Sequence, residues 1–211
     1  MSKLTLTLNS EMFKQKVPKM KILVTGGTGF IGRHLVKLLK KQGHEVEVWD
    51  LVIEKPMHEE WLVDDVQYSI VDITDAGKVK DCMKDFMPEC VIHLAGKSGV
   101  RESVHNPLGY TQTNVVGTEN VLLASCRNYV KRFIFASSSS VYGDQIMNSM
   151  EYGSSEACNA DRPISPYANT KRIGELLCHT YSTMYPIETV ALRFFTVYGP
   201  WCRRDMVVGK F

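Results

Sequence analysis

The sequence predicts an α/β fold in which a parallel sheet is covered by helices on both faces. The first observation is that short apolar segments, typical of strands, alternate with segments of helical periodicity from residue 21 to residue 194. The second is the composition: 44% hydrophobic and 23% charged residues in a chain of 211 are ordinary for a folded domain. Strands that alternate with helices are joined by crossover connections, and such connections build parallel sheets.

The first half of the chain begins with an apolar strand at 21–25. In the helix that follows, Ile31, Leu35 and Leu38 recur at helical spacing, and Gly43 ends it. The remaining predicted elements of this half are strands at 45–49 and 66–71, each followed by an aspartate, a helix at 76–86 and a strand at 90–94.

The second half continues the same alternation. It predicts a long amphipathic helix at 110–129 and a fifth strand at 132–136, followed by a polar loop at 143–163. A second long helix at 167–185 and a sixth strand at 188–194 complete the pattern. We expect the crossovers between these parallel strands to be right-handed.

Charge and composition argue against several classes of partner. The 25 Lys and Arg residues nearly balance the 23 Asp and Glu residues, so the formal charge of +2 gives no reason to expect nucleic acid or a membrane surface. No apolar run approaches the roughly 20 residues that a transmembrane helix needs. The six cysteines form no C-x-x-C pair, which is typical of reduced thiols in the cytoplasm, and no Cys/His cluster predicts a bound metal.

The chain is predicted to form one main domain. Residues 1–20 are expected to be an extension that precedes the first strand, and residues 21–211 are expected to be the domain itself. In the extension, Leu4, Leu6 and Leu8 alternate with polar residues, unlike the continuous apolar run of a secretory signal.

A glycine-rich turn follows the first strand. Gly26, Gly29 and Gly32 give the spacing G-x-x-G-x-x-G, which permits a tight turn, a close approach of the backbone to a pyrophosphate and close packing of helix on strand. The N-terminus of the next helix would face the phosphates. Asp50, 18 residues beyond Gly32, could accept hydrogen bonds from ribose hydroxyls and would repel a 2′-phosphate, and Asp72 could approach the adenine.

Two further patterns predict proton-transfer chemistry. Tyr167 and Lys171 form a Y-x-x-x-K pair, and residues four apart on a helix share one face. A neighbouring ammonium favours the phenolate form of a tyrosine, which would then act as a base. The run Ser137–Ser140 follows the fifth strand, where a hydroxyl could hydrogen-bond a reacting alcohol.

With these motifs in this order, the sequence resembles the extended short-chain dehydrogenase/reductases, the family of NAD-dependent nucleotide-sugar epimerases and dehydratases. The resemblance covers about residues 21–206, and within the family it is most similar to UDP-glucuronate 4-epimerases. Other segments that carry it are 93–96 (HLAG), 99–101 (GVR), 113–118 (TNVVGT), 165–168 (SPYA) and 192–200 (LRFFTVYGP), with Arg203, Asp205 and Met206 beyond them.

The resemblance implies a Rossmann-like doubly wound sheet that binds NAD. The implied NAD contacts are Gly26, Gly29, Phe30, Ile31, Gly32, Asp50, Asp72, Ile73, Leu94, Ala95, Asn114, Tyr167 and Lys171. The implied catalytic residues are Ser138, Tyr167 and Lys171. The implied substrate contacts are Arg101, Ser139, Thr196 and Arg203, of which the two arginines would face a hexuronate carboxylate.

The resemblance also implies a reaction: epimerisation at C4 of a UDP-hexuronate or UDP-hexose through a transient 4-keto sugar, with NAD regenerated. The dehydratases of the family carry Thr-Asp-Glu in place of Ser138–Ser140, and the decarboxylases carry a glutamate in place of Ser140, so epimerisation is favoured. Two alternatives remain open, a dehydratase and an NAD-binding homologue without activity. The family further implies a homodimer formed through the two long helices.

The chain is shorter than members of the family. We therefore expect the C-terminal substrate domain to be largely absent from it, so that NAD binding is better supported by the sequence than turnover is.

Overall fold

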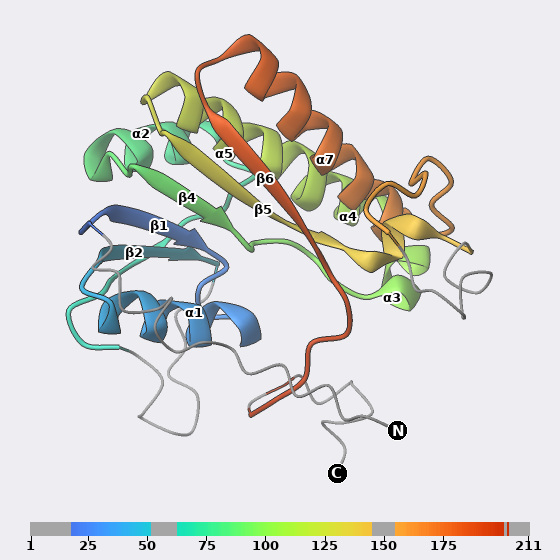
Figure 1. Cartoon of the computed structure of the whole chain (residues 1–211), viewed down its shortest axis with the longest axis horizontal. Helices are drawn as coiled ribbons and strands as arrows, with labels where there is room; N and C mark the ends of the chain where they lie inside the picture. Colours follow the sequence, from blue (N-terminus) through green and yellow to red (C-terminus); the bar gives the residue numbers. More distant parts are fainter. Residues whose placement is uncertain (1–17, 52–62, 145–154, 201, 203–211) are drawn as a thin grey trace, which may run out of the picture.

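The computed structural model describes residues 18–51, 63–144, 155–200 and 202. Its six strands form one parallel sheet in the order β3-β2-β1-β4-β5-β6 (Figure 1). The strands are β1 (Lys21–Thr25), β2 (Glu45–Asp50), β3 (Gln67–Ile70), β4 (Cys90–His93), β5 (Arg132–Ser138) and β6 (Glu188–Phe194). The expected Rossmann-like sheet is therefore confirmed, and its strand order reverses between β1 and β4, the place where such sheets open a ligand crevice.

Helices lie on both faces of the sheet. They are α1 (Phe30–Lys41), α2 (Ala76–Phe86), α3 (Val100–His105), α4 (Pro107–Thr111), the π-helical segment η3 (Gln112–Val116), α5 (Gly117–Arg127), the short 3₁₀ helix η4 (Ser139–Tyr142) and α7 (Pro166–Met184). In Figure 1, α2, α5 and α7 cover one face, whereas α1 lies on the other face against β1 and β2.

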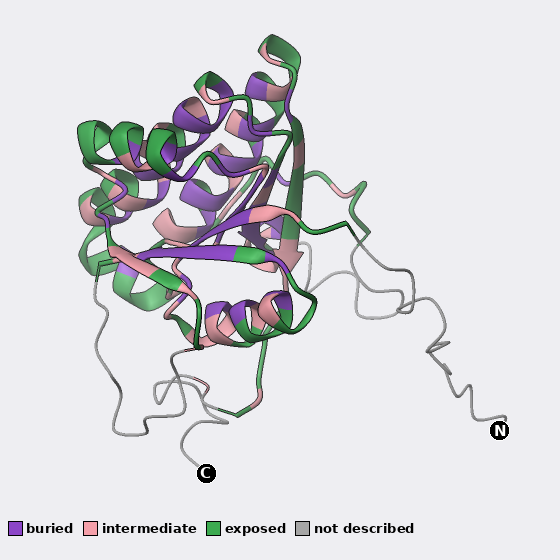
Figure 2. Cartoon of the chain, turned by 90° about the vertical axis from the view of Figure 1, so that its left-hand side faces the viewer, coloured by how far each residue is buried: buried purple, intermediate pink, exposed green. Residues whose placement is uncertain are grey.

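The core has two layers because successive strand residues point to opposite faces. Leu23 and Phe133 are fully buried on the side of α2, α5 and α7. Val24 and Val48 are fully buried on the other side, where they pack with Val36 of α1. Figure 2 shows the same core, with β1, β2, β4 and β5 mostly buried and the helices exposed on their outward faces, whereas the edge strands β3 and β6 contain no buried residue.

Several predicted boundaries agree with the structure. The bounds of β1, α2 and β6 are those predicted, and α7 and the other strands differ by one or two residues. Helix α7 begins at Pro166 because the Ser165 hydroxyl accepts a hydrogen bond from the N–H of Ala168 and proline suits the first helical position.

The predicted helix at 110–129 is wrong in detail. The helix starts earlier, at Pro107, where the Asn106 side chain caps it by accepting from the N–H of Gly109. It contains the π-helical segment η3 and ends at Arg127, two residues before Tyr129 adopts a left-handed conformation (φ +57°). The short helix α3 was not predicted at all.

Other sequence expectations concern particular residues. All six cysteines are free thiols, and Cys90, Cys126 and Cys178 are buried. Of the expected N-terminal extension, residues 1–17 lie outside the described part of the chain. Within the described ranges, we find no helix with the length and apolar character needed to cross a membrane.

Candidate active site

Two adjoining cavities lie at the carboxyl end of the sheet. The one we call the aspartate cavity measures about 530 Å³ and includes Asp50 and Asp72. The one we call the tyrosine cavity measures about 420 Å³ and includes Tyr167. Residues common to both linings are Gly26, Gly29, Leu94, Gly96 and Lys97. The two cavities are therefore continuous across the glycine turn between β1 and α1.

The glycine turn needs its glycines for reasons of space. Gly26 has φ +69°, and a Cβ there would lie 2.6 Å from the backbone nitrogen of Ala95. A Cβ at Gly32 would collide with the carbonyl oxygen of Gly26. No side chain in the described residues caps α1, and its first turn holds no acid. Its free N–H groups at Phe30 and beyond suit an anion such as a phosphate.

The aspartate cavity holds two oriented carboxylates. Asp50, the last residue of β2, accepts hydrogen bonds from the Thr28 N–H (3.1 Å) and hydroxyl (2.6 Å). Asp72 follows β3 and accepts from the N–H and the hydroxyl of Thr74, both at 2.8 Å. Ile73 and Ala95 also line this cavity. Four residues expected to contact NAD are thus brought together.

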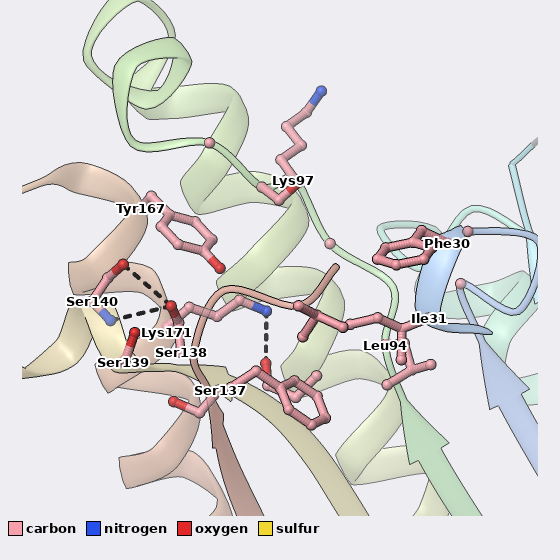
Figure 3. Close-up of a pocket in the computed structure, with 18 of the residues that line it drawn as sticks. Phe30, Ile31, Leu94, Lys97, Ser137, Ser138, Ser139, Ser140, Tyr167 and Lys171 are labelled. Carbon is pink, nitrogen blue, oxygen red and sulfur yellow. Dashed lines mark hydrogen bonds between the residues drawn. The ribbon is translucent and has the colours of Figure 1, made fainter. Parts of the chain in front are cut away.

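In the tyrosine cavity, Tyr167 and Lys171 lie one turn apart on α7 (Figure 3). The Lys171 Nζ donates to the Ala136 carbonyl of β5 at 2.8 Å and lies 6.0 Å from the centre of the Tyr167 ring. The lysine is buried, and burial lowers its pKa to about 8. The ammonium and the phenol thus face the same cavity.

The serines after β5 have different environments. The Ser138 Oγ lies 3.2 Å from the Ser140 Oγ and accepts from the Ser140 N–H at 3.2 Å, beside Tyr167 and Lys171 (Figure 3). Ser137 instead donates to the Glu175 carboxylate at 2.6 Å. Alternation along the extended strand separates the two hydroxyls, so Ser138 is the one aligned with the tyrosine.

Asn114 holds the loop between the cavities. Its Oδ1 accepts from the Lys97 N–H at 2.7 Å, and its Nδ2 donates to the Lys97 carbonyl at 2.9 Å and to the Thr170 hydroxyl at 3.0 Å. The side chain is buried in the π-helical segment η3 and does not belong to the lining of either cavity. Asn114 therefore lies behind the cavity wall rather than on it.

His93, for which no role was predicted, supports the same cavity wall as Asn114. Its Nδ1 lies 2.7 Å from the Thr25 hydroxyl and its Nε2 lies 3.0 Å from the Thr118 hydroxyl. Complete burial, with a smaller contribution from the charge of Lys171, lowers the pKa of His93 to about 3. The imidazole is therefore neutral and serves as a fixed link between β1, β4 and α5.

The remaining predicted site residues are distributed unevenly. Phe30, Ile31, Ser139 and Thr196 line the tyrosine cavity. Arg101 is exposed on α3 and does not line it, although its neighbour Val100 does. Arg203, like Asp205 and Met206, lies outside the described residues.

Lys97, Glu175 and Arg193 were not predicted as site residues. Lys97 is exposed at the junction of the two cavities. Glu175 lies four residues beyond Lys171 and so on the same face of α7, a spacing that could have identified it. Arg193 lies 18 residues further along the chain and binds Glu175 from β6. No sequence motif or periodicity links these two residues.

This arrangement can move a proton and hold a dinucleotide. A phenol, a buried ammonium and a serine hydroxyl face one cavity, as acid–base chemistry on an alcohol requires. That cavity continues into an uncapped helix N-terminus and two carboxylates, the combination that suits a pyrophosphate and a ribose.

Comparisons with known proteins agree with this geometry. The NAD dependent epimerase/dehydratase family model matches residues 22–211. Protein CapI of Staphylococcus aureus is 41% identical, in a match that covers 91% of this chain and 58% of CapI. A probable UDP-glucuronate 4-epimerase of Rhizobium meliloti is 36% identical over the same shares, 91% and 58%.

Among solved structures, the UDP-glucose 4-epimerase of Thermus thermophilus, in complex with NAD, superimposes with a TM-score of 0.81 at 34% identity. The superposition covers 90% of this chain and 60% of that one. The chain thus spans about 58% of the length of the two curated relatives. Because the family model extends over nearly all of its residues, this chain belongs to the NAD-dependent epimerase/dehydratase family.

Proposed function

We propose that this chain carries the NAD-binding and proton-transfer part of an NAD-dependent UDP-sugar 4-epimerase that acts on a UDP-hexuronate or UDP-hexose. The observation that carries the proposal is the buried Lys171 beside Tyr167, in a cavity continuous with the glycine turn and Asp50. The sugar nucleotide is inferred from the names of the relatives, one of which is a probable UDP-glucuronate 4-epimerase.

The residues of the crevice fit NAD. The turn at Gly26 and Gly32 leaves no room for a Cβ, and the uncapped N-terminus of α1 suits the pyrophosphate. Asp50 would receive the adenosine ribose and Asp72 would lie near the adenine. The other proposed contacts are Gly29, Phe30, Ile31, Ile73, Leu94, Ala95, Tyr167 and Lys171, whereas Asn114 would act from behind the wall by holding the backbone of Lys97.

The catalytic roles follow from the tyrosine cavity. When bound, NAD supplies the hydride acceptor and, once reduced, the hydride donor. Tyr167 takes the proton of the sugar 4-hydroxyl as hydride leaves C4, and Lys171 stabilises the phenolate. Ser138 donates a hydrogen bond to the same sugar oxygen. After the flat 4-keto sugar has turned over, Tyr167 returns the proton and the configuration at C4 is inverted.

The lining of the tyrosine cavity favours epimerisation over dehydration. Removing water across C5–C6 needs an acid and a base beside those carbons. Among the described residues that line this cavity, none is an aspartate or a glutamate. Ser139 and Thr196 are proposed to contact the sugar, and Arg101 and Arg203 are proposed to bind a hexuronate carboxylate.

The organisation of the chain is also a proposal. Residues 21–211 would form the NAD-binding domain, preceded by the extension 1–20, in a cytoplasmic homodimer. Pairing is proposed through the two long helices, as the family resemblance implies, and Leu176 of α7 is an exposed apolar side chain available for it.

Incubation with NAD and UDP-glucuronate, followed by chromatography of the sugar nucleotides, tests the proposal. We expect the C4 epimer to form and Tyr167→Phe to abolish its formation. An NAD-induced thermal shift with unchanged UDP-glucuronate and UDP-glucose would instead indicate an NAD-binding homologue without activity. The absence of any shift with NAD would reject the proposed cofactor.

A further inference from the structure

The geometry points to Glu175 and Arg193 as positioning residues. Their ion pair ties α7 to β6, and the hydrogen bond from Ser137 to Glu175 ties α7 to β5. Together these contacts fix the backbone carbonyl that holds Lys171. We call the ion pair, together with Ser137, the strand–helix clamp. The inference rests on the proposed function, because Lys171 matters for turnover only if Tyr167 is the base.

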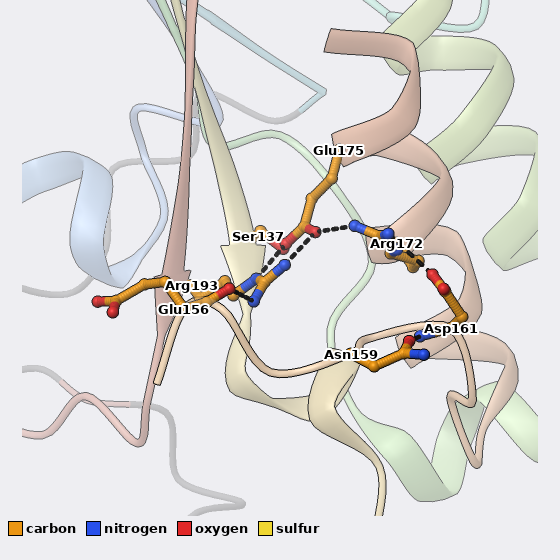
Figure 4. A network of polar contacts seen from close by, with 7 residues as sticks. All are labelled: Ser137, Glu156, Asn159, Asp161, Arg172, Glu175 and Arg193. Carbon is orange, nitrogen blue, oxygen red and sulfur yellow. Dashed lines mark hydrogen bonds and ion pairs between the residues drawn. The ribbon is translucent and has the colours of Figure 1, made fainter. Parts of the chain in front are cut away.

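The clamp joins three elements through one buried carboxylate (Figure 4). Arg193 of β6 donates from Nε to one Glu175 oxygen and from Nη2 to the other, both at 2.9 Å. Ser137 of β5 donates to the first oxygen at 2.6 Å, and Arg172 donates to the second at 2.9 Å. A two-point arginine–carboxylate contact fixes orientation as well as distance.

The clamp does not act as a counterion for Lys171. Burial alone would raise the pKa of Glu175, but the hydrogen bonds from Arg193, Ser137 and Arg172 outweigh it, and the net pKa is lowered. The pKa of Arg193 is raised, mainly by its hydrogen bonds to Glu175. With its charge so neutralised, Glu175 contributes nothing evident to the pKa of Lys171, which is lowered by desolvation. The role we infer is therefore geometric.

The path from the clamp to the lysine is short. Ser137, held by Glu175, directly follows Ala136, whose carbonyl accepts the Lys171 ammonium hydrogen bond at 2.8 Å. Glu175, Lys171 and Tyr167 lie on one face of α7 at intervals of four residues. The same carboxylate thus fixes both the helix that carries the ammonium and the peptide that orients it, and small displacements of such groups slow catalysis.

A second ion pair offers a matched control. Arg132 and Glu188 also join β5 to β6, but at the opposite end of these strands and in solvent. Arg132→Gln therefore removes a strand-to-strand arginine contact without touching the cavity. Ser137→Ala is a milder change than Arg193→Gln, because it cuts the link to β5 and leaves the ion pair intact.

Steady-state turnover of a UDP-sugar is the first measurement. We expect Arg193→Gln to lower kcat by on the order of tenfold and Ser137→Ala to lower it less, with KM and NAD affinity within about twofold. Arg132→Gln should leave kcat unchanged. Equal losses in Arg193→Gln and Arg132→Gln, or losses in NAD affinity that match those in kcat, would overturn the inference.

A second measurement does not depend on turnover. The titration of the Lys171 ammonium can be followed by NMR of isotope-labelled lysine in the NAD-bound protein. The Lys171 signal is identified by its absence from the spectrum of Lys171→Met. Around Nζ lie the Ala136 carbonyl and the Phe135 ring of β5, neutral His93 of β4, and Tyr167 of α7.

Displacing the Ala136 carbonyl removes the acceptor of the ammonium, so Ser137→Ala and Arg193→Gln should lower the pKa of Lys171 further below about 8. Arg132→Gln should not. An unchanged titration in both clamp variants, with the protein folded, would refute the positioning role. If the wild-type protein is inactive but the pKa of Lys171 is lower in the clamp variants than in the wild type, the proposed function is contradicted and the clamp is supported.

Discussion

The two halves of the crevice are built by different means. Around the aspartate cavity, the contacts are exposed or part-buried: Asp72 is held by Thr74, two residues away, and Asp50 is held by Thr28 of the glycine turn, 22 residues earlier. Around the tyrosine cavity, the contact between Lys171 and Ala136 is buried and the contact between Glu175 and Arg193 is part-buried. The carboxylates of the first half come from motifs at strand ends, whereas the polar network of the second half exists only once β5, β6 and α7 have assembled.

The difference predicts different costs of mutation. In the aspartate half, we expect backbone space and one carboxylate to determine affinity for the dinucleotide. In the tyrosine half, a buried charge without a carboxylate partner must be tolerated by the fold, which costs stability. Four variants would separate these contributions.

The largest expected effect is in the tyrosine half. Tyr167→Phe removes the proton acceptor and should lower turnover of the UDP-sugar by about 10²–10⁴-fold, since this is the usual contribution of a general base. NAD affinity, measured by calorimetry, should change little. Tyr129→Phe, at an exposed position, is the control and should be fully active. Equal activity of the two variants would contradict the role of Tyr167.

Lys171 should make stability depend on pH. Its pKa is lowered from 10.5 to about 8 in the folded protein, so between these values the unfolded chain binds more protons and stability rises with pH. Relative to Lys171→Met, the wild-type unfolding free energy should increase by about 2–3 kcal/mol from pH 7 to pH 10. Denaturant titrations of both proteins at each pH give this difference. A constant difference would mean that Lys171 is hydrated.

In the aspartate half, space at Gly32 should matter most. Gly32→Ala places a methyl group against the Gly26 carbonyl and should lower the unfolding free energy by about 1–3 kcal/mol while weakening NAD binding. Gly77→Ala is the control, because a Cβ there meets only the Asp75 side chain, at 3.3 Å. The prediction fails if both variants melt at the wild-type temperature.

The smallest effect concerns the choice of dinucleotide. Asp50→Asn should weaken NAD binding by about tenfold and improve NADP binding relative to NAD, because a charged acceptor is lost and repulsion of a 2′-phosphate disappears. Asp81→Asn on the exposed surface of α2 makes the same change in net charge and should alter neither affinity. If the ratio of NAD affinity to NADP affinity is unchanged in Asp50→Asn, then Asp50 does not bind the adenosine ribose.

The sequence predicted the aspartate half more fully than the tyrosine half, and the comparison explains why. The glycine spacing, the helix after it and an aspartate at a strand end are local features, and each appears in the structure where it was expected. Tyr167 and Lys171 were also predictable, since four residues on a helix define a common face.

The features that were missed depend on partners far along the chain. Glu175 contacts Ser137, which lies 38 residues earlier in the chain, and Arg193, which lies 18 residues later. Sequence periodicity does not predict such pairs. Arg101, which its motif predicts at the substrate, is exposed on α3 one residue from Val100 of the cavity lining, and its role stays a prediction. Asn106 followed by proline is a typical helix start, and it places the beginning of the helix at Pro107, three residues before the predicted start at 110.

The contacts that Asn114 makes from the π-helical segment Gln112–Val116 constrain the length of the helix around it. An α-helix advances by about 100° for each residue, so deleting one residue between Asn106 and Asn114 would rotate the preceding turn by that angle relative to α5. The side-chain amide of Asn114 binds the backbone of Lys97 from within this wide turn, and the backbone carbonyl of Asn114 accepts from the Thr118 hydroxyl at 2.6 Å. We expect natural variation in this helix to proceed by substitution, with insertions and deletions confined to the loops on either side.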